Sequence, residues 1–89
     1  MYKLIVKVAN VEGSCGVHKT GDYFEIRDDA LYIPEGKRVC TWSLSTLLPF
    51  LSACQRQITD KKDWLPNVGE IHCPDPEGKV YWQIEKLPL

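Results

Sequence analysis

Hydrophobic and polar residues alternate in four stretches of the chain, and each alternation predicts a β-strand. The stretches are residues 2–11, 22–27, 70–73 and 79–86. The apolar residues that share a face are Tyr2, Leu4, Val6 and Val8 in the first stretch, Phe24 and Ile26 in the second, and Val80, Trp82 and Ile84 in the last. The turn sequence PDPEG separates the last two stretches, so we expect them to form a hairpin.

A helical period replaces the period of two after residue 40. The apolar positions of this pattern are Leu44, Leu47, Leu48, Leu51 and Cys54. Their spacing predicts an amphipathic helix with one apolar stripe. Thr41 or Ser43 can cap its start. Pro49 lies inside the pattern and has no backbone donor, so either the helix kinks there or a second short helix begins.

The segment between the second strand and the helix resists regular structure. RDDA turns the chain, and we expect LYIPEGKRVC to be extended or irregular because Pro34 and Gly36 both disfavour a helix. The predicted order is therefore strand, strand, helix, strand, strand. The simplest packing of these elements is an α+β domain, in which the Pro-interrupted helical segment covers one face of a small antiparallel sheet.

Length and charge narrow the class of protein. A chain of 89 residues has room for one core, so we expect one domain over residues 1–89. The net charge is −1, with both signs interspersed, and this pattern lacks the concentrated basic footprint of a nucleic-acid-binding protein. No glycine-rich loop that cradles a phosphate is present, so we expect no nucleotide cofactor.

Location and association follow from the apolar segments. The longest apolar-leaning stretch, residues 44–54, is too short to span a membrane, and the N-terminus lacks the pattern of a signal peptide. We therefore expect a cytoplasmic protein, in which four cysteines favour metal binding or reactivity over disulfides. Small sheets have free edges, so self-association as a homo-oligomer is allowed, with no stoichiometry indicated.

Three cysteines and one histidine form the main candidate site. Cys15 and His18 have C-x-x-H spacing within one loop, Cys40 falls just before the helix, and Cys73 falls at the end of a strand. Zinc and iron in small domains favour thiolate and imidazole ligands, commonly four in a tetrahedron. The sequence therefore predicts a zinc or iron site made by Cys15, His18, Cys40 and Cys73.

Two other interpretations of these cysteines stay open. In the first, the protein is a thiol-based redox or catalytic protein, with Cys40 as a thiolate at the helix start and Cys15 or Cys73 as its resolving thiol. In the second, the protein is a non-catalytic interaction module and the cysteines only pack. The sequence does not decide whether the protein is an enzyme.

The remaining chemical groups divide between packing and the site. Cys54 continues the helical stripe, so we interpret it as a core residue. His72 alternates with Cys73, so we expect it on the opposite surface of the sheet and hold it as a possible proton carrier. Asp22 and Asp75 favour turn formation; the alternative is a role as a ligand's hydrogen-bond acceptor or a general base, and Asp75 is a catalytic candidate with Cys40.

Three tryptophans are many for this length. Trp82 belongs to the alternating hairpin and is expected in the core. Trp42 and Trp64 flank the helical segment. They could line a pocket, but core packing is the favoured interpretation for both.

The chain resembles an uncharacterised family of small prokaryotic proteins that occur singly or as tandem copies. The segments that carry the resemblance are VEGSCGVHKTGDYFEI, IPEGKRVCTWSLSTLLPFLSA and IHCPDPEGKVYWQIEK. The family pattern has a Cys and a His before Gly-Asp, a Pro-x-Gly segment before a second Cys, and a Cys-Pro-Asp motif. Members often have one more residue between the Cys and the His. The family is a domain of unknown function, so the resemblance implies no activity, but it singles out the same three cysteines and histidine.

Overall fold

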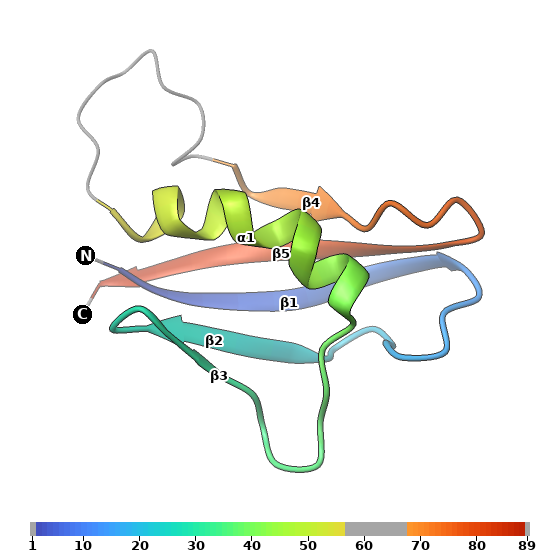
Figure 1. The fold of residues 1–89 in the computed structure, drawn as a ribbon, viewed down its shortest axis with the longest axis horizontal. Helices are drawn as coiled ribbons and strands as arrows, with labels where there is room; N and C mark the ends of the chain where they lie inside the picture. Colours follow the sequence, from blue (N-terminus) through green and yellow to red (C-terminus); the bar gives the residue numbers. More distant parts are fainter. Residues whose placement is uncertain (1, 57–67, 89) are drawn as a thin grey trace.

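In the part of the chain that the structure describes, five antiparallel strands form one sheet, in the order β3-β2-β1-β5-β4, and one helix packs on one face of it (Figure 1). The computed structural model describes residues 2–56 and 68–88. The elements are β1 (Tyr2–Gly13), β2 (Tyr23–Arg27), β3 (Ala30–Tyr32), α1 (Thr41–Gln55), β4 (Glu70–His72) and β5 (Gly78–Pro88). Trp64 lies outside the described residues.

The predicted element order was wrong, because a third strand precedes the helix and the sheet dominates the fold. Asp28 and Asp29 have φ angles of 52° and 61°, the left-handed conformation that a two-residue hairpin turn requires. This tight turn brings β3 back along β2, with Ile26 opposite Leu31. The sequence favoured an irregular segment because of Pro34, but that residue lies after β3 and does not interrupt its pairing.

The predicted strand faces are confirmed for β2 and for the long central pair, β1 and β5. β1 and β5 pair from Tyr2 opposite Pro88 to Gly13 opposite Gly78, and the register shifts between Val8 and Asn10. The inward residues are Leu4, Val6, Val8, Phe24, Ile26, Val80 and Trp82, each at most 7% exposed. Burial of these apolar side chains between the sheet and the helix stabilises the fold. The predicted hairpin of β4 and β5 is also confirmed.

Helix α1 contributes a narrower apolar stripe than its sequence indicates. Leu47, Leu51 and Cys54 are buried against the sheet, but Leu48 is 51% exposed. Position 48 therefore faces solvent, and the core interpretation of Cys54 is confirmed.

The start of α1 differs from expectation, and its continuity decides between the alternatives at Pro49. Cys40 is the N-cap residue and makes no side-chain cap hydrogen bond, so the predicted caps Thr41 and Ser43 are wrong. The helix runs without a break through Pro49, and the second-helix alternative is therefore excluded. Within residues 2–56 and 68–88, no helix combines the length and the apolar character needed to cross a membrane.

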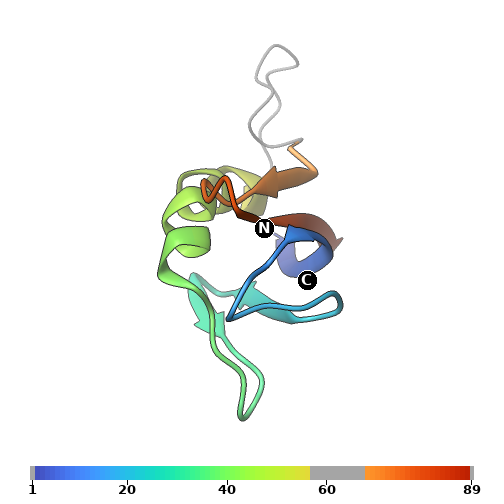
Figure 2. The same cartoon turned by 90° about the vertical axis from the view of Figure 1, so that its right-hand side faces the viewer.

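One end of the sheet gathers the loops that carry the candidate residues; Figure 2 looks onto this end. The amide of Ser14 donates a hydrogen bond to the carbonyl of Glu77 at 3.2 Å. Gly13 and Gly78 allow this close approach, because a Cβ atom on either one would collide with a backbone carbonyl of the facing loop. The β1–β2 loop and the β4–β5 loop therefore lie side by side.

Candidate functional site

His18 is the centre of the β1–β2 loop and uses both of its ring nitrogens within the protein. The backbone amide of Cys40 donates to Nε2 at 3.0 Å, and Nδ1 lies 3.4 Å from Oδ2 of Asp22. Because Nε2 accepts a hydrogen bond, the neutral ring carries its proton on Nδ1 and donates it to Asp22. The residue is only 5% exposed, and its ring meets the Trp82 ring edge-on at 4.7 Å.

Burial sets the charge state of His18. It lowers the pKa of the imidazole and outweighs the hydrogen bond and negative charge of Asp22, which raise it; Arg38 lowers it further. The imidazole is therefore neutral near pH 7.

Asp22 stays ionised beside that ring. Burial raises the pKa of this carboxyl, but the Lys19 amide, His18 and the Lys37 ammonium together hold it below its usual value. The Lys19 amide donates to Asp22 at 3.2 Å, so the turn interpretation of Asp22 is confirmed. Nζ of Lys37 lies 3.7 Å from Oδ1 of the same carboxylate.

The three cysteines of the predicted metal site occupy different settings. Cys15 is half-buried, and its Sγ accepts the His18 amide at 3.4 Å. Cys40 makes its hydrogen bond to His18 with its backbone amide and not with its thiol. Cys73 is 4% exposed; its Sγ accepts the Val80 amide at 3.2 Å and donates to the Gly78 carbonyl at 3.4 Å. The thiol of Cys73 is therefore part of the β4–β5 connection.

These contacts do not fit a Cys3His metal centre. Among the described residues, no three Cys, His, Asp or Glu side chains are grouped so that they could hold an ion. A metal-bound histidine needs a free ring nitrogen, and both nitrogens of His18 already have protein partners. A zinc or iron site at Cys15, His18, Cys40 and Cys73 stays a prediction from the sequence, and it would require these hydrogen bonds to break.

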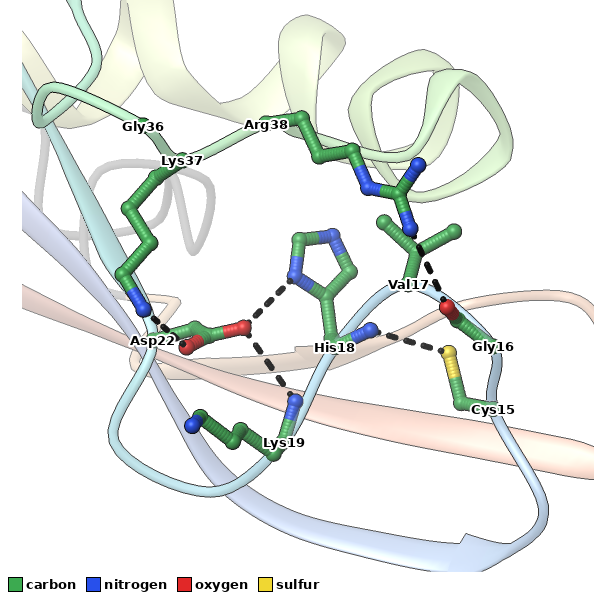
Figure 3. Close-up of a pocket in the computed structure, with 9 residues that line it drawn as sticks. All are labelled: Cys15, Gly16, Val17, His18, Lys19, Asp22, Gly36, Lys37 and Arg38. Atoms are coloured by element: carbon green, nitrogen blue, oxygen red, sulfur yellow. Dashed lines mark hydrogen bonds and ion pairs between the residues drawn. The ribbon is translucent and has the colours of Figure 1, made fainter.

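The structure instead places a cavity of about 330 Å³ beside His18. Its described lining consists of Cys15, Gly16, Val17, His18, Lys19, Asp22, Gly36, Lys37 and Arg38. Figure 3 shows that the side chains of Lys37 and Arg38 extend into the cavity from the segment before α1, while the β1–β2 loop forms the opposite wall. Nη2 of Arg38 donates to the Gly16 carbonyl at 3.3 Å and joins the two walls.

The cavity is rich in positive charge. Lys19, Lys37 and Arg38 are cationic, and Asp22 is the one acid among the described lining residues. These cations come from two separate segments and form no basic run, so the sequence pattern does not mark them as a group. The available signal was the pair of short sequences HKTGD and EGKRV, each of which places a cationic residue within two positions of a glycine with a positive φ angle.

The other candidates lie elsewhere. Asp75 is exposed, and its Oδ1 accepts the Glu77 amide at 2.9 Å, which confirms the turn interpretation. His72 is exposed and Cys73 is buried, as the alternation predicted. Trp82 is in the core as expected, but Trp42 is 70% exposed, so the core interpretation of Trp42 was wrong.

No protein-family model, no curated protein and no solved structure matches this chain. The resemblance to the uncharacterised prokaryotic family therefore stays a prediction, and the function has to be argued from the geometry.

Proposed function

We propose that this protein is a binding domain for a small anion, which it holds in the cavity beside His18. One observation carries the proposal: three cationic side chains from two separate loops surround one cavity, in a chain whose net charge is −1. Scattered surface charges of a near-neutral protein do not by themselves concentrate at one hollow, and such a concentration attracts anions.

The single carboxylate does not cancel this charge. Asp22 is occupied by the Lys19 amide, His18 and Lys37. The neutral imidazole of His18 adds no charge. The two remaining cations, Lys19 and Arg38, are exposed and make no ion pair among the described residues. They are available to a ligand that enters from solvent.

The donors indicate the ligand's chemistry. Arg38 donates one N–H to the Gly16 carbonyl. Because a guanidinium has five N–H donors, the others can make a bidentate contact with a carboxylate or a phosphate. Lysine ammonium groups act as point charges beside it. A small molecule that carries a carboxylate or a phosphate fits this set.

Titration with inorganic phosphate and with citrate, followed by amide NMR at low salt, tests the proposal. We expect saturable shifts at Gly16, Lys19 and Arg38, and binding that weakens as ionic strength rises. Arg38→Gln and Lys19→Gln should each weaken binding about threefold to tenfold. Lys7→Gln, an exposed lysine on β1, is the matched control. Equal binding by all four proteins would overturn the proposal.

A second candidate function is thiol chemistry at Cys15, not at Cys40. The observation that favours it is the hydrogen bond from the His18 amide to Cys15 Sγ on the wall of the same cavity, since an amide donor stabilises a thiolate. Cys15 is a free thiol, and in the cytoplasmic location that we propose for this protein it would stay reduced.

Alkylation separates the two functions. Iodoacetate and iodoacetamide both transfer a carbon to the thiolate and release iodide, but only iodoacetate carries a negative charge. An anion-binding cavity should raise the rate ratio of iodoacetate to iodoacetamide at Cys15, and Arg38→Gln should lower that ratio. A thiol function also requires Cys15 to react faster with iodoacetamide than a free cysteine near pH 7; a slower reaction excludes it.

A further inference from the structure

We propose that a second cavity, whose described lining consists of Trp42, Pro74 and Asp75, binds a small organic cation such as an alkylammonium or guanidinium group. The cavity measures about 300 Å³ and lies where the start of α1 meets the β4–β5 connection. The proposal goes beyond the anion cavity and does not rest on it, because the two cavities share no described lining residue.

Trp42 supplies the aromatic surface. Among residues 2–56 and 68–88 it is the most exposed large hydrophobic residue, at 70%, although indole rings are normally well buried. Its backbone is held in place, because the hydroxyls of Ser45 and Thr46 both donate to its carbonyl, at 2.8 and 3.2 Å. The backbone of Trp42 is therefore fixed while its ring stays exposed to solvent, where a ligand can contact it.

Asp75 supplies the negative charge on the same cavity. Its Oδ1 accepts the Glu77 amide, and no other hydrogen bond or ion pair to this carboxylate occurs among residues 2–56 and 68–88. Pro74 and Pro76 flank it and restrict the backbone on both sides. The carboxylate is therefore positioned by the turn and still has lone pairs for a ligand.

The combination of the two groups selects a cation. A tryptophan face attracts ammonium and guanidinium groups through its π-electrons, and more strongly so beside a carboxylate. An anion would meet Asp75, and a neutral apolar molecule would leave that charge without a partner. Glu77 is a second exposed acid on the same turn and adds to the negative potential.

The test is a titration with choline and with its neutral isostere 3,3-dimethylbutan-1-ol, followed by the NMR signals of the Trp42 indole and the Asp75 amide. Choline is expected to shift both signals saturably, and the isostere, which differs in charge, to bind at least fivefold more weakly. Nα-acetyl-argininamide forms a second arm. Tighter binding of this compound than of choline identifies the source as an arginine side chain of a protein; the reverse order identifies a free ammonium compound.

Two variants keep the test independent of folding. Asp75→Asn retains an oxygen that can accept a hydrogen bond from the Glu77 amide, and it removes only the charge. This variant should weaken the binding of choline about threefold to fivefold. Trp42→Phe keeps an aromatic ring, but its π-face attracts cations more weakly. It should weaken the binding of choline by a similar factor, followed through the NMR signal of the Asp75 amide. Equal shifts by choline and its isostere, or unchanged choline affinity in Asp75→Asn, would overturn the proposal.

Discussion

The imidazole of His18 accepts the backbone amide of Cys40 at 3.0 Å, across 22 residues of sequence. This hydrogen bond joins the β1–β2 loop to the first residue before α1. On the other side of the ring, Asp22 receives the remaining N–H. The histidine that sequence spacing assigned to a metal therefore connects the two walls of the cavity for which we propose anion binding, and its neutral form is the one that does so.

Replacement of His18 should destabilise the protein more than replacement of the second histidine. His18→Ala leaves the Cys40 amide without its acceptor and removes a buried ring from Trp82, and we expect a loss of about 2–3 kcal/mol in the free energy of unfolding. His72→Ala, at an exposed site, should change it by less than about 0.5 kcal/mol. Urea denaturation of both variants measures the difference; equal losses would show that the ring is not a structural connection.

Stability should fall as pH drops below about 6.5. The pKa of His18 in the folded protein lies below its ordinary value of 6.5, so the unfolded chain takes up the proton first. The contribution of His18 is fully present above pH 6.5 and is lost as pH falls through the folded pKa. The expected slope is at most about 1.4 kcal/mol per pH unit, measured by urea denaturation between pH 7.5 and pH 5.

Two variants locate the source of that slope. His18→Gln should flatten stability across this range, while His72→Ala should retain the slope. Asp22 also has a folded pKa below its usual 3.8, but its contribution is present above that value and is lost only in more acidic solution. A slope that persists in His18→Gln would assign the pH dependence to another group.

The metal prediction has a direct test. Because His18 and Cys73 already have partners within the protein, we expect zinc and iron well below one ion per chain in protein purified without added metal. Chelator should leave the Tm unchanged. Elemental analysis and thermal unfolding with and without chelator measure both quantities. One firmly bound ion per chain, with a Tm that falls in chelator, would restore the Cys3His site and show that the loop rearranges around it.

Because the β1–β2 and β4–β5 loops lie so close together, we expect a glycine to be required at position 78. A Cβ at Gly78 would collide with the backbone carbonyl of Ser14, whereas a Cβ at Gly16 meets nothing within 4 Å. We expect Gly78→Ala to lose about 1–3 kcal/mol of folding free energy. Gly16→Ala, in the same loop region, is the control and should lose less than about 1 kcal/mol. Comparison of the Tm values of the two variants tests whether the loops lie as close together as described.

Local pattern was sufficient for much of the fold. The alternation in β1, β2 and β5 indicated both the strands and their buried faces, because a period of two places every second side chain on the same side of a sheet. The helical spacing likewise placed Cys54 in the core. β3 was missed because it is short and its stability comes from pairing with β2, which no local period reveals.

The site depended on contacts between distant segments. Spacing identified Cys15 and His18 as neighbours, and that is a local property of one loop. Whether His18 faces a metal or the Cys40 amide depends on where the segment before α1 packs. The gathering of Lys19 with Lys37 and Arg38, and of Trp42 with Asp75, depends on the same packing. Residue types set the chemistry that the chain can offer, while the long-range pairing of β1 with β5 and the docking of α1 on the sheet choose which of those groups meet.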